Sequence, residues 1–234
     1  MSTRNQRLRS GVLVRAPEGD FVIDTGPELR LQLLQNGASL IRAALFTHAH
    51  ADHVTGLDDL RIFGFRLDAE LPLFCEERVE KAIRQMFSYA FVDRETLTHR
   101  FAAPRFQFRR IVPGEPFELL GLEVLPIRLQ HGPLPILGFR IGDVAFCTDV
   151  SSIPPESNQH LQNLDTLILG ALRYKPHPTH LHVDAAVKVA RKLNPRRTFL
   201  THMAHDLDYE LLDSELPDGM QPAHDGLVIA VDAG

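Results

Sequence analysis

The feature that most constrains this chain is a run of metal-binding side-chain types directly after a short apolar segment. Residues 43–47 (Ala-Ala-Leu-Phe-Thr) are typical of a buried strand, and His48, His50, Asp52 and His53 follow at once. Residues two apart in an extended strand end point to the same side, and Asp52 and His53 continue on a turn into the next helix. Imidazole and carboxylate together suit zinc, and also manganese or iron. The string therefore predicts a site for two metal ions.

Three further apolar runs end in the same way. Residues 122–127 lead to His131, residues 144–148 lead to Asp149, and residues 198–201 lead to His202. Alone, each of these residues would be read as a packed histidine or a turn cap. Strand ends and the loops after them build sites in α/β folds, so beside the histidine string the three become ligand candidates.

Hydrophobic periodicity predicts strands separated by helices, which is typical of an α/β layer architecture. The expected strands are Gly11–Val14, Phe21–Ile23, Ala43–Phe46, Leu122–Ile127, Leu137–Ile141, Val144–Cys147, Thr166–Leu169, Thr198–Leu200 and Leu227–Val231. The expected helices are Glu28–Asn36, Gly56–Leu67, Glu77–Phe87, Asp184–Leu193 and Asp208–Glu215. Gly142 and Asp143 predict a hairpin turn. The alternating segment Phe101–Arg110 is read as a half-buried strand or rim loop, not as a surface on which bases stack.

Composition narrows the class of protein. The 234 residues favour one domain over residues 1–234, and 25 basic against 30 acidic residues give a net charge of −5. That charge argues against nucleic-acid or anionic-membrane partners. Stretches of about 20 apolar residues, which a membrane helix needs, do not occur. A polar start without a signal sequence, and only two cysteines (Cys75 and Cys147), predict a cytoplasmic protein.

Residues 47–61, 21–26 and 200–206 resemble the corresponding segments of the metallo-β-lactamase-fold hydrolases. Within that superfamily the chain is most similar to the cyclic-phosphodiesterase (PhnP-like) branch, and ribonuclease Z is a more distant relative. The resemblance implies an αββα sandwich with a two-metal site at one edge. It covers nearly the whole chain.

The resemblance also implies a role for each donor. It assigns His48, His50 and His131 to one metal, and Asp52, His53 and His202 to the other, with Asp149 as the bridge. The metals would be zinc or manganese, with iron also compatible. In the family, the residue at Asp24 supports the histidine loop from behind; from the sequence alone, a turn former at a strand end is an equal reading.

The implied catalytic residues are Asp52, which would also orient the attacking hydroxide, and His180, which would protonate the leaving group. His180 and His182 could exchange roles, because spacing alone separates them. His182 otherwise falls at the N-cap of the helix that follows. His177 is read as a loop histidine.

The expected activity is hydrolysis of a small phosphodiester, which could be cyclic, by a hydroxide that two metals activate. An aspartate at the bridging position suits phosphodiester chemistry. Ribonuclease Z-like RNA processing, thioester or lactone hydrolysis, and an inactive metal-binding protein remain alternatives. By analogy with relatives, a homodimer is expected.

Two departures from the family pattern matter. Relatives begin with an additional strand, a Gly-Thr-Gly loop and a cysteine-containing segment, whereas this chain opens with residues 4–10, so the sandwich is expected to lack its usual first strand. In the relatives, the residue at His205 joins those cysteines around a structural zinc. Because the cysteines are absent, the sequence does not establish that zinc here, and His205 is either a ligand left without its partners or an ordinary histidine at the rim of the site.

Overall fold

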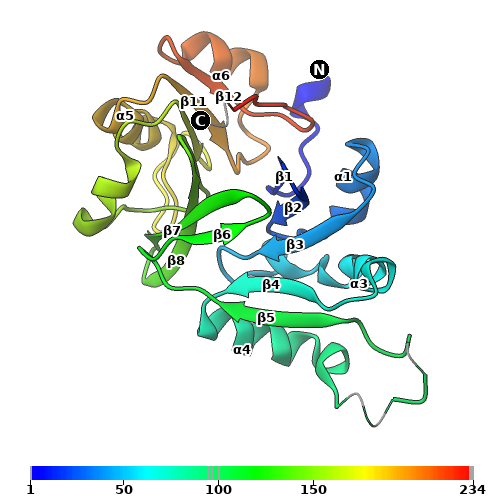
Figure 1. The fold of residues 1–234 in the computed structure, drawn as a ribbon. Helices are drawn as coiled ribbons and strands as arrows, with labels where there is room; N and C mark the ends of the chain where they lie inside the picture. The colour runs from blue at the N-terminus through cyan, green and yellow to red at the C-terminus, as the bar shows by residue number, and fades with distance from the viewer. Residues whose placement is uncertain (1, 94, 96, 100, 232–234) are drawn as a thin grey trace. The chain divides into compact units, whose positions relative to one another are not determined.

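A five-stranded sheet, in the order β1-β2-β3-β4-β5, organises residues 9–112 (Figure 1). The computed structural model describes residues 2–93, 95, 97–99 and 101–231. The strands are β1 (Val12–Ala16), β2 (Gly19–Ile23), β3 (Ile41–Leu45), β4 (Leu71–Cys75) and β5 (Phe106–Arg110). β1 and β2 are antiparallel, whereas β2 to β5 pair in parallel. The carboxyl ends of β2 and β3 therefore meet at one edge, where Asp24 and His48 follow.

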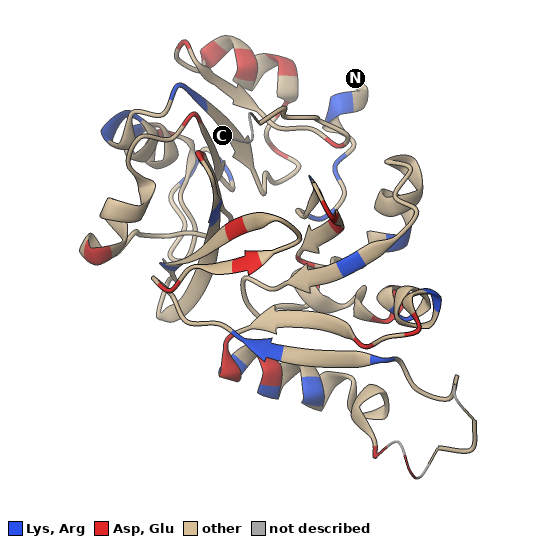
Figure 2. Ribbon diagram, viewed as in Figure 1, with Lys and Arg blue, Asp and Glu red and all other residues tan. Residues whose placement is uncertain are grey.

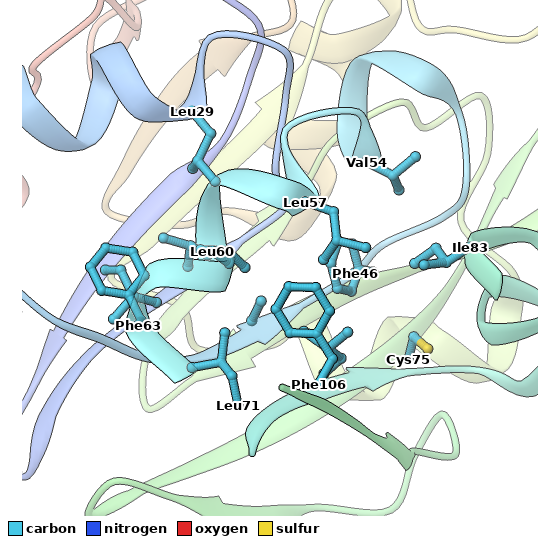
Figure 3. Close-up of a cluster of buried hydrophobic side chains, with 14 of the residues drawn as sticks. Leu29, Phe46, Val54, Leu57, Leu60, Phe63, Leu71, Cys75, Ile83 and Phe106 are labelled. Carbon is cyan, nitrogen blue, oxygen red and sulfur yellow. The ribbon is translucent and has the colours of Figure 1, made fainter. Parts of the chain in front are cut away.

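Helices pack against this sheet through one buried cluster. They are α1 (Leu29–Gln35), α2 (Ala51–Val54), η2 (Leu57–Leu60), α3 (Arg61–Leu67), α4 (Glu77–Met86) and η3 (Ser88–Phe91). Side chains alternate across a strand, so every second strand residue reaches the helices. Figure 3 shows this packing: Leu71 and Phe106 from the strands meet Leu57, Leu60 and Ile83 from the helices.

Charged residues lie on α4 and on the edge strand β5 (Figure 2), and their side chains join the two elements. Glu80 accepts from Arg84 on its own helix and from Arg110 on β5, each at 2.8 Å. The Arg84 guanidinium also lies 4.9 Å from the ring centre of Phe91 and 4.8 Å from that of Phe108. These contacts cover the edge of the sheet with charge, which blocks strand addition there.

Residues 1–8 and 113–234 form a second compact unit around a seven-stranded sheet, ordered β12-β11-β10-β9-β8-β7-β6. The strands are β6 (Phe117–Leu119), β7 (Leu122–His131), β8 (Leu134–Ile141), β9 (Val144–Cys147), β10 (Thr166–Gly170), β11 (Arg197–Thr201) and β12 (Met220–Pro222). β6 to β9 pair antiparallel and β9 to β12 pair in parallel. The carboxyl ends of β9 and β11 therefore share an edge.

The helical segments of this second unit include η1 (Thr3–Asn5), η5 (Pro155–Leu161), α5 (Val183–Leu193) and α6 (Tyr209–Glu215). α5 packs on the sheet because Ala186, Ala190 and Leu193 recur at helical spacing on one face. They meet Leu167 and Leu200 of the strands in one cluster. Among the described residues, no helix has the length and apolar character needed to cross a bilayer.

Most of the expected elements are present, including the Gly142–Asp143 hairpin between β8 and β9. The prediction of a strand at Leu227–Val231 is wrong, because residues 227–231 form no strand. Val228 is 85% exposed, so its β-branched side chain gains no stabilisation from burial in a sheet. The expected helix Gly56–Leu67 divides into η2 and α3. Short strands β4, β6 and β12 were not expected, because a brief apolar run carries too little periodicity. The single domain over residues 1–234 stays a prediction.

Candidate metal centre

The histidine string lies at the end of β3, as predicted. His48 follows the strand and is 1% exposed, while His50 is the exposed N-cap of α2. Asp52 and His53 lie in the first turn of that helix, and His53 is also 1% exposed. The ring centres of His48 and His50 are 4.5 Å apart, and those of His48 and His53 are 4.3 Å apart. The Oδ2 atom of Asp52 lies 3.6 Å from Nε2 of His53, so one short loop gathers four donor side chains.

A buried carboxylate sets the orientation of two of these rings. Asp24, at the end of β2, accepts the backbone N–H and the hydroxyl of Thr47, each at 2.8 Å, and Nδ1–H of His53 at 2.8 Å. Because the Thr47 hydroxyl donates to Asp24, it accepts from Nδ1 of His48, which lies 2.9 Å away. Both histidines therefore carry their proton on Nδ1. The lone pair of each ring is on Nε2, the atom that would ligate a metal.

Backbone contacts hold the loop against the turn after β2. Thr25 donates from its N–H to the His53 carbonyl at 2.7 Å and accepts from the N–H of Gly56 at 2.9 Å. A Cβ on Gly56 would lie 2.1 Å from the carbonyl oxygen of Gly26. Position 56 therefore requires glycine.

In the second unit, His131 is the last residue of β7 and is 6% exposed. Its Nδ1–H donates to the carbonyl oxygen of Thr179 at 2.7 Å, so its lone pair is also on Nε2. The carbonyl belongs to a loop 48 residues further along the chain. The tautomer of this histidine is thus set by tertiary structure.

Asp149 and His202 follow β9 and β11, and both adopt left-handed backbone conformations, with φ of 53° and 56°. The Thr148 hydroxyl donates to Oδ1 of Asp149 at 2.7 Å. The same oxygen lies 3.3 Å from Nε2 of His202, and Oδ2 lies 4.0 Å from Nδ1 of His180. One donor atom from each of Asp149, His180 and His202 lies within 4.8 Å of the others. These three residues form a cluster that could hold a metal ion.

His180 lies among the other rings of this unit. Its ring centre is 4.5 Å from that of His131 and 5.1 Å from that of His202, on which it stacks. Burial, opposed by Asp149 and assisted by His202 and His131, lowers the pKa of His180 to about 4. Without an additional negative charge nearby, the ring is neutral at pH 7.

The remaining candidates have different surroundings. His182 is the N-cap of α5, as predicted, but its side chain makes no capping hydrogen bond. His205 is exposed. Cys75 and Cys147 are buried within β4 and β9, and burial raises the pKa of each thiol to about 12.

Two threonines that hold the donors were not identified from the sequence. Thr47 connects His48 to Asp24, and the carbonyl of Thr179 accepts from His131. The position of Thr47, directly before the histidine string at the end of an apolar run, was a usable signal. Thr179 acts through its backbone, so no residue-type signal exists for it.

The comparisons with known proteins agree with this architecture. The profile of the beta-lactamase superfamily domain matches residues 20–203. The chain belongs to this family, the metallo-β-lactamase superfamily. Its mixed sheets and helices are the α/β fold expected from the resemblance, and the His and Asp cluster is compatible with a divalent metal site.

Individual relatives place the chain more narrowly. The crystal structure of a diphosphatase from the PhnP family is 38% identical, with a TM-score of 0.90 over 99% of this chain and 87% of that chain. This similarity confirms the PhnP-like branch. The short form of human tRNase Z is 19% identical, with a TM-score of 0.72 over 95% of this chain and 92% of that chain, and shows the fold alone.

A curated octanoyltransferase from Porphyromonas gingivalis (strain ATCC BAA-308 / W83) is 34% identical over 232 residues. The match covers 97% of this chain but 46% of that protein. The chain therefore spans about half the length of this relative.

Proposed function

We propose that the chain is a two-metal hydrolase of small phosphate diesters or of diesters of diphosphate. The observation that carries the proposal is the common state of His48, His53 and His131: each ring is held through Nδ1 and carries its lone pair on Nε2. Metal-binding histidines are oriented in this way by acceptors on their other nitrogen. The similarity to a PhnP-family diphosphatase over nearly the whole chain supports phosphate ester chemistry.

The donor set fits divalent cations. One cation would be held by His48, His50 and His131, the second by Asp52, His53 and His202, and Asp149 would be shared. Imidazole nitrogens with carboxylate oxygens suit zinc and manganese, and also iron. Divalent cations at these ligands supply Lewis acidity, which lowers the pKa of water and offsets the negative charge of a phosphate.

The protein's own groups would orient the reaction. Asp52 would orient the attacking water through its carboxylate. The water oxygen bonds to phosphorus, the bond from phosphorus to the leaving oxygen breaks, and His180 delivers a proton to that oxygen. His180 lies beside Asp149 and is not in either proposed ligand set, and an anionic phosphate near its ring favours the protonated form.

Acyl transfer or thioester hydrolysis is the main competing class, since a relative is an octanoyltransferase. Cysteine-based acyl transfer needs a thiolate, but burial raises the pKa of both cysteine thiols to about 12. We therefore propose that this chain does not carry an acyl group on cysteine. Processing of RNA is disfavoured by the net charge of −5.

The test combines metal analysis with turnover on four substrates: bis(p-nitrophenyl) phosphate, a ribose cyclic phosphate, an octanoyl thioester and a lactone. We expect two equivalents of metal and hydrolysis of a phosphate diester. His50→Ala and Asp149→Ala should lose metal and abolish turnover, while His160→Ala, in η5, should match the parent. Turnover of only the thioester or the lactone would overturn the proposal. Full activity and metal content in His50→Ala would refute the ligand assignment.

A further inference from the structure

The loop between β10 and α5 is folded by its own side chains. At its base the N–H of Leu172 donates to the carbonyl of Leu181 at 2.9 Å. Inside the loop, Nε and Nη2 of Arg173 donate to the carbonyls of Lys175 and Pro176, at 3.1 and 2.8 Å. The guanidinium therefore shapes the turn that precedes His177.

His177, which the sequence suggested was an ordinary loop histidine, has a defined tautomer in this loop. The backbone N–H of Thr179 donates to its Nδ1 at 3.3 Å, and the Thr179 hydroxyl lies at the same distance. Since Nδ1 accepts, the neutral ring carries its proton on Nε2. Burial, Arg173 and His131 lower the pKa of His177, which favours this neutral form.

The ring of His177 also lies beside the candidate proton donor. The ring centres of His177 and His180 are 5.1 Å apart, with an angle of 56° between the ring planes. His180 in turn lies next to Asp149. His177 is therefore one ring further from the Asp149 carboxylate than His180.

We propose that His177 is a substrate-binding residue whose Nε2–H donates to the leaving group, and that this contact selects diesters of diphosphate. The inference rests on the proposed function. In such a substrate the leaving group is itself a phosphate monoester with anionic oxygens, and a hydrogen bond to a charged acceptor is stronger than one to an ether or phenol oxygen. The exposed ammonium of Lys175 adds positive charge to the same loop.

Hydrolysis of a diphosphate diester consumes one water molecule. The water oxygen bonds to one phosphorus, the bond from that phosphorus to the bridging oxygen breaks, and the second phosphoryl group leaves with that oxygen. The products are two phosphomonoesters, and no other reactant is required.

A purely structural role for His177 predicts a different result. Through Thr179, the ring could position His131 for every substrate equally. His177→Asn keeps an oxygen near Nδ1 that can accept from Thr179 but places no donor at Nε2. His177→Gln places an amide N–H near Nε2. The two variants therefore separate the contact with the loop from the contact with the substrate.

The experiment measures kcat/KM for P1,P2-di(adenosine) diphosphate and for bis(p-nitrophenyl) phosphate with the metal-loaded protein. We expect His177→Ala and His177→Asn to lower the ratio of the two kcat/KM values, diphosphate over diester, about tenfold or more, mainly through a higher KM for the diphosphate. His177→Gln should restore part of this ratio. His160→Ala, which changes a histidine of η5 in the same unit, should leave the ratio unchanged.

Three outcomes overturn the inference. They are an equal loss on both substrates, a parent-like ratio in His177→Asn, and a parent protein that hydrolyses the diester but not the diphosphate. In all three the proposed function survives. If the metal-loaded parent hydrolyses neither phosphate substrate, nor a ribose cyclic phosphate, the proposed function itself fails.

Discussion

Oδ2 of Asp24 lies 2.8 Å from Nδ1 of His53, and both side chains are almost fully buried. Asp24 adopts a left-handed backbone conformation, with φ of 64°, that aims its carboxylate at the loop 29 residues away. The same carboxylate reaches His48 through Thr47. One residue that is not expected to touch a metal thus determines the protonation pattern of two proposed ligands.

Replacing Asp24 by asparagine should weaken metal binding. An amide keeps an acceptor for the Thr47 N–H, but its NH₂ group would face Nδ1–H of His53, which places donor against donor. We expect metal affinity to fall about 10- to 100-fold, measured by competition with a chelator.

Asp20→Asn is the matched control, because Asp20 lies on β2, the strand that Asp24 follows, and its carboxylate pairs with Arg15 at 3.7 Å. Metal affinity in Asp24→Asn equal to that of the control would contradict the positioning role.

Arg7 should stabilise the second unit. Its Nη2 donates to the Leu207 carbonyl at 2.8 Å and to Oδ1 of Asn5 at 3.2 Å, and its Nη1 donates to the Ala204 carbonyl at 3.4 Å. Figure 1 shows the N-terminal segment beside the turn that precedes α6. Arg7→Ala should cost about 1–3 kcal/mol in the free energy of unfolding, measured in urea.

Arg7→Lys should recover little of that stability, since an ammonium cannot span two carbonyls as a guanidinium does. The exposed Arg30 is the control, and Arg30→Ala should stay within about 0.5 kcal/mol of the parent. Equal effects at the two positions would show that Arg7 does not hold this segment.

Gly56→Ala should destabilise the first unit. The added Cβ would meet the Gly26 carbonyl at 2.1 Å, and backbone atoms cannot yield as a flexible side chain can. We expect a loss of about 1–3 kcal/mol, measured as a lower urea midpoint. Gly11→Ala is the comparison, because its nearest contact would be an ordinary 3.5 Å. A midpoint in Gly56→Ala as high as in Gly11→Ala would show that the turn can open at no cost.

Asp165 should contribute stability that depends on pH. Hydrogen bonds from Arg196 and from the hydroxyl of Thr166, together with Arg197, lower the pKa of Asp165 to about 2. The folded state therefore favours the ionised carboxylate. Its contribution is fully present above the unfolded pKa of about 3.9 and is lost as pH falls towards 2.

Asp165→Asn should consequently lower the melting temperature at pH 7, and the difference from the parent should narrow between pH 4 and pH 2. The exposed Asp213 is the control. A difference that is the same at pH 7 and pH 2.5 would mean that the charge of Asp165 is not the cause.

The positions of the proposed donor residues were predictable because these residues sit in local patterns. His48, His131, Asp149 and His202 all lie at or directly after the carboxyl end of a strand, where the apolar runs placed them. A buried strand needs an apolar run and a site needs polar residues, so the boundary between the two is visible in sequence. The predicted strand at residues 227–231 is absent, because the apolar side chain of Val228 is exposed there.

What the sequence determined by itself was therefore the His and Asp side chains at the strand ends and the superfamily. The tertiary structure decided which nitrogen of each ring carries the proton. Asp24 meets His53 across 29 residues, and Thr179 meets His131 across 48. A hydrogen bond depends on where two groups lie in space, and no periodicity along the chain encodes that distance.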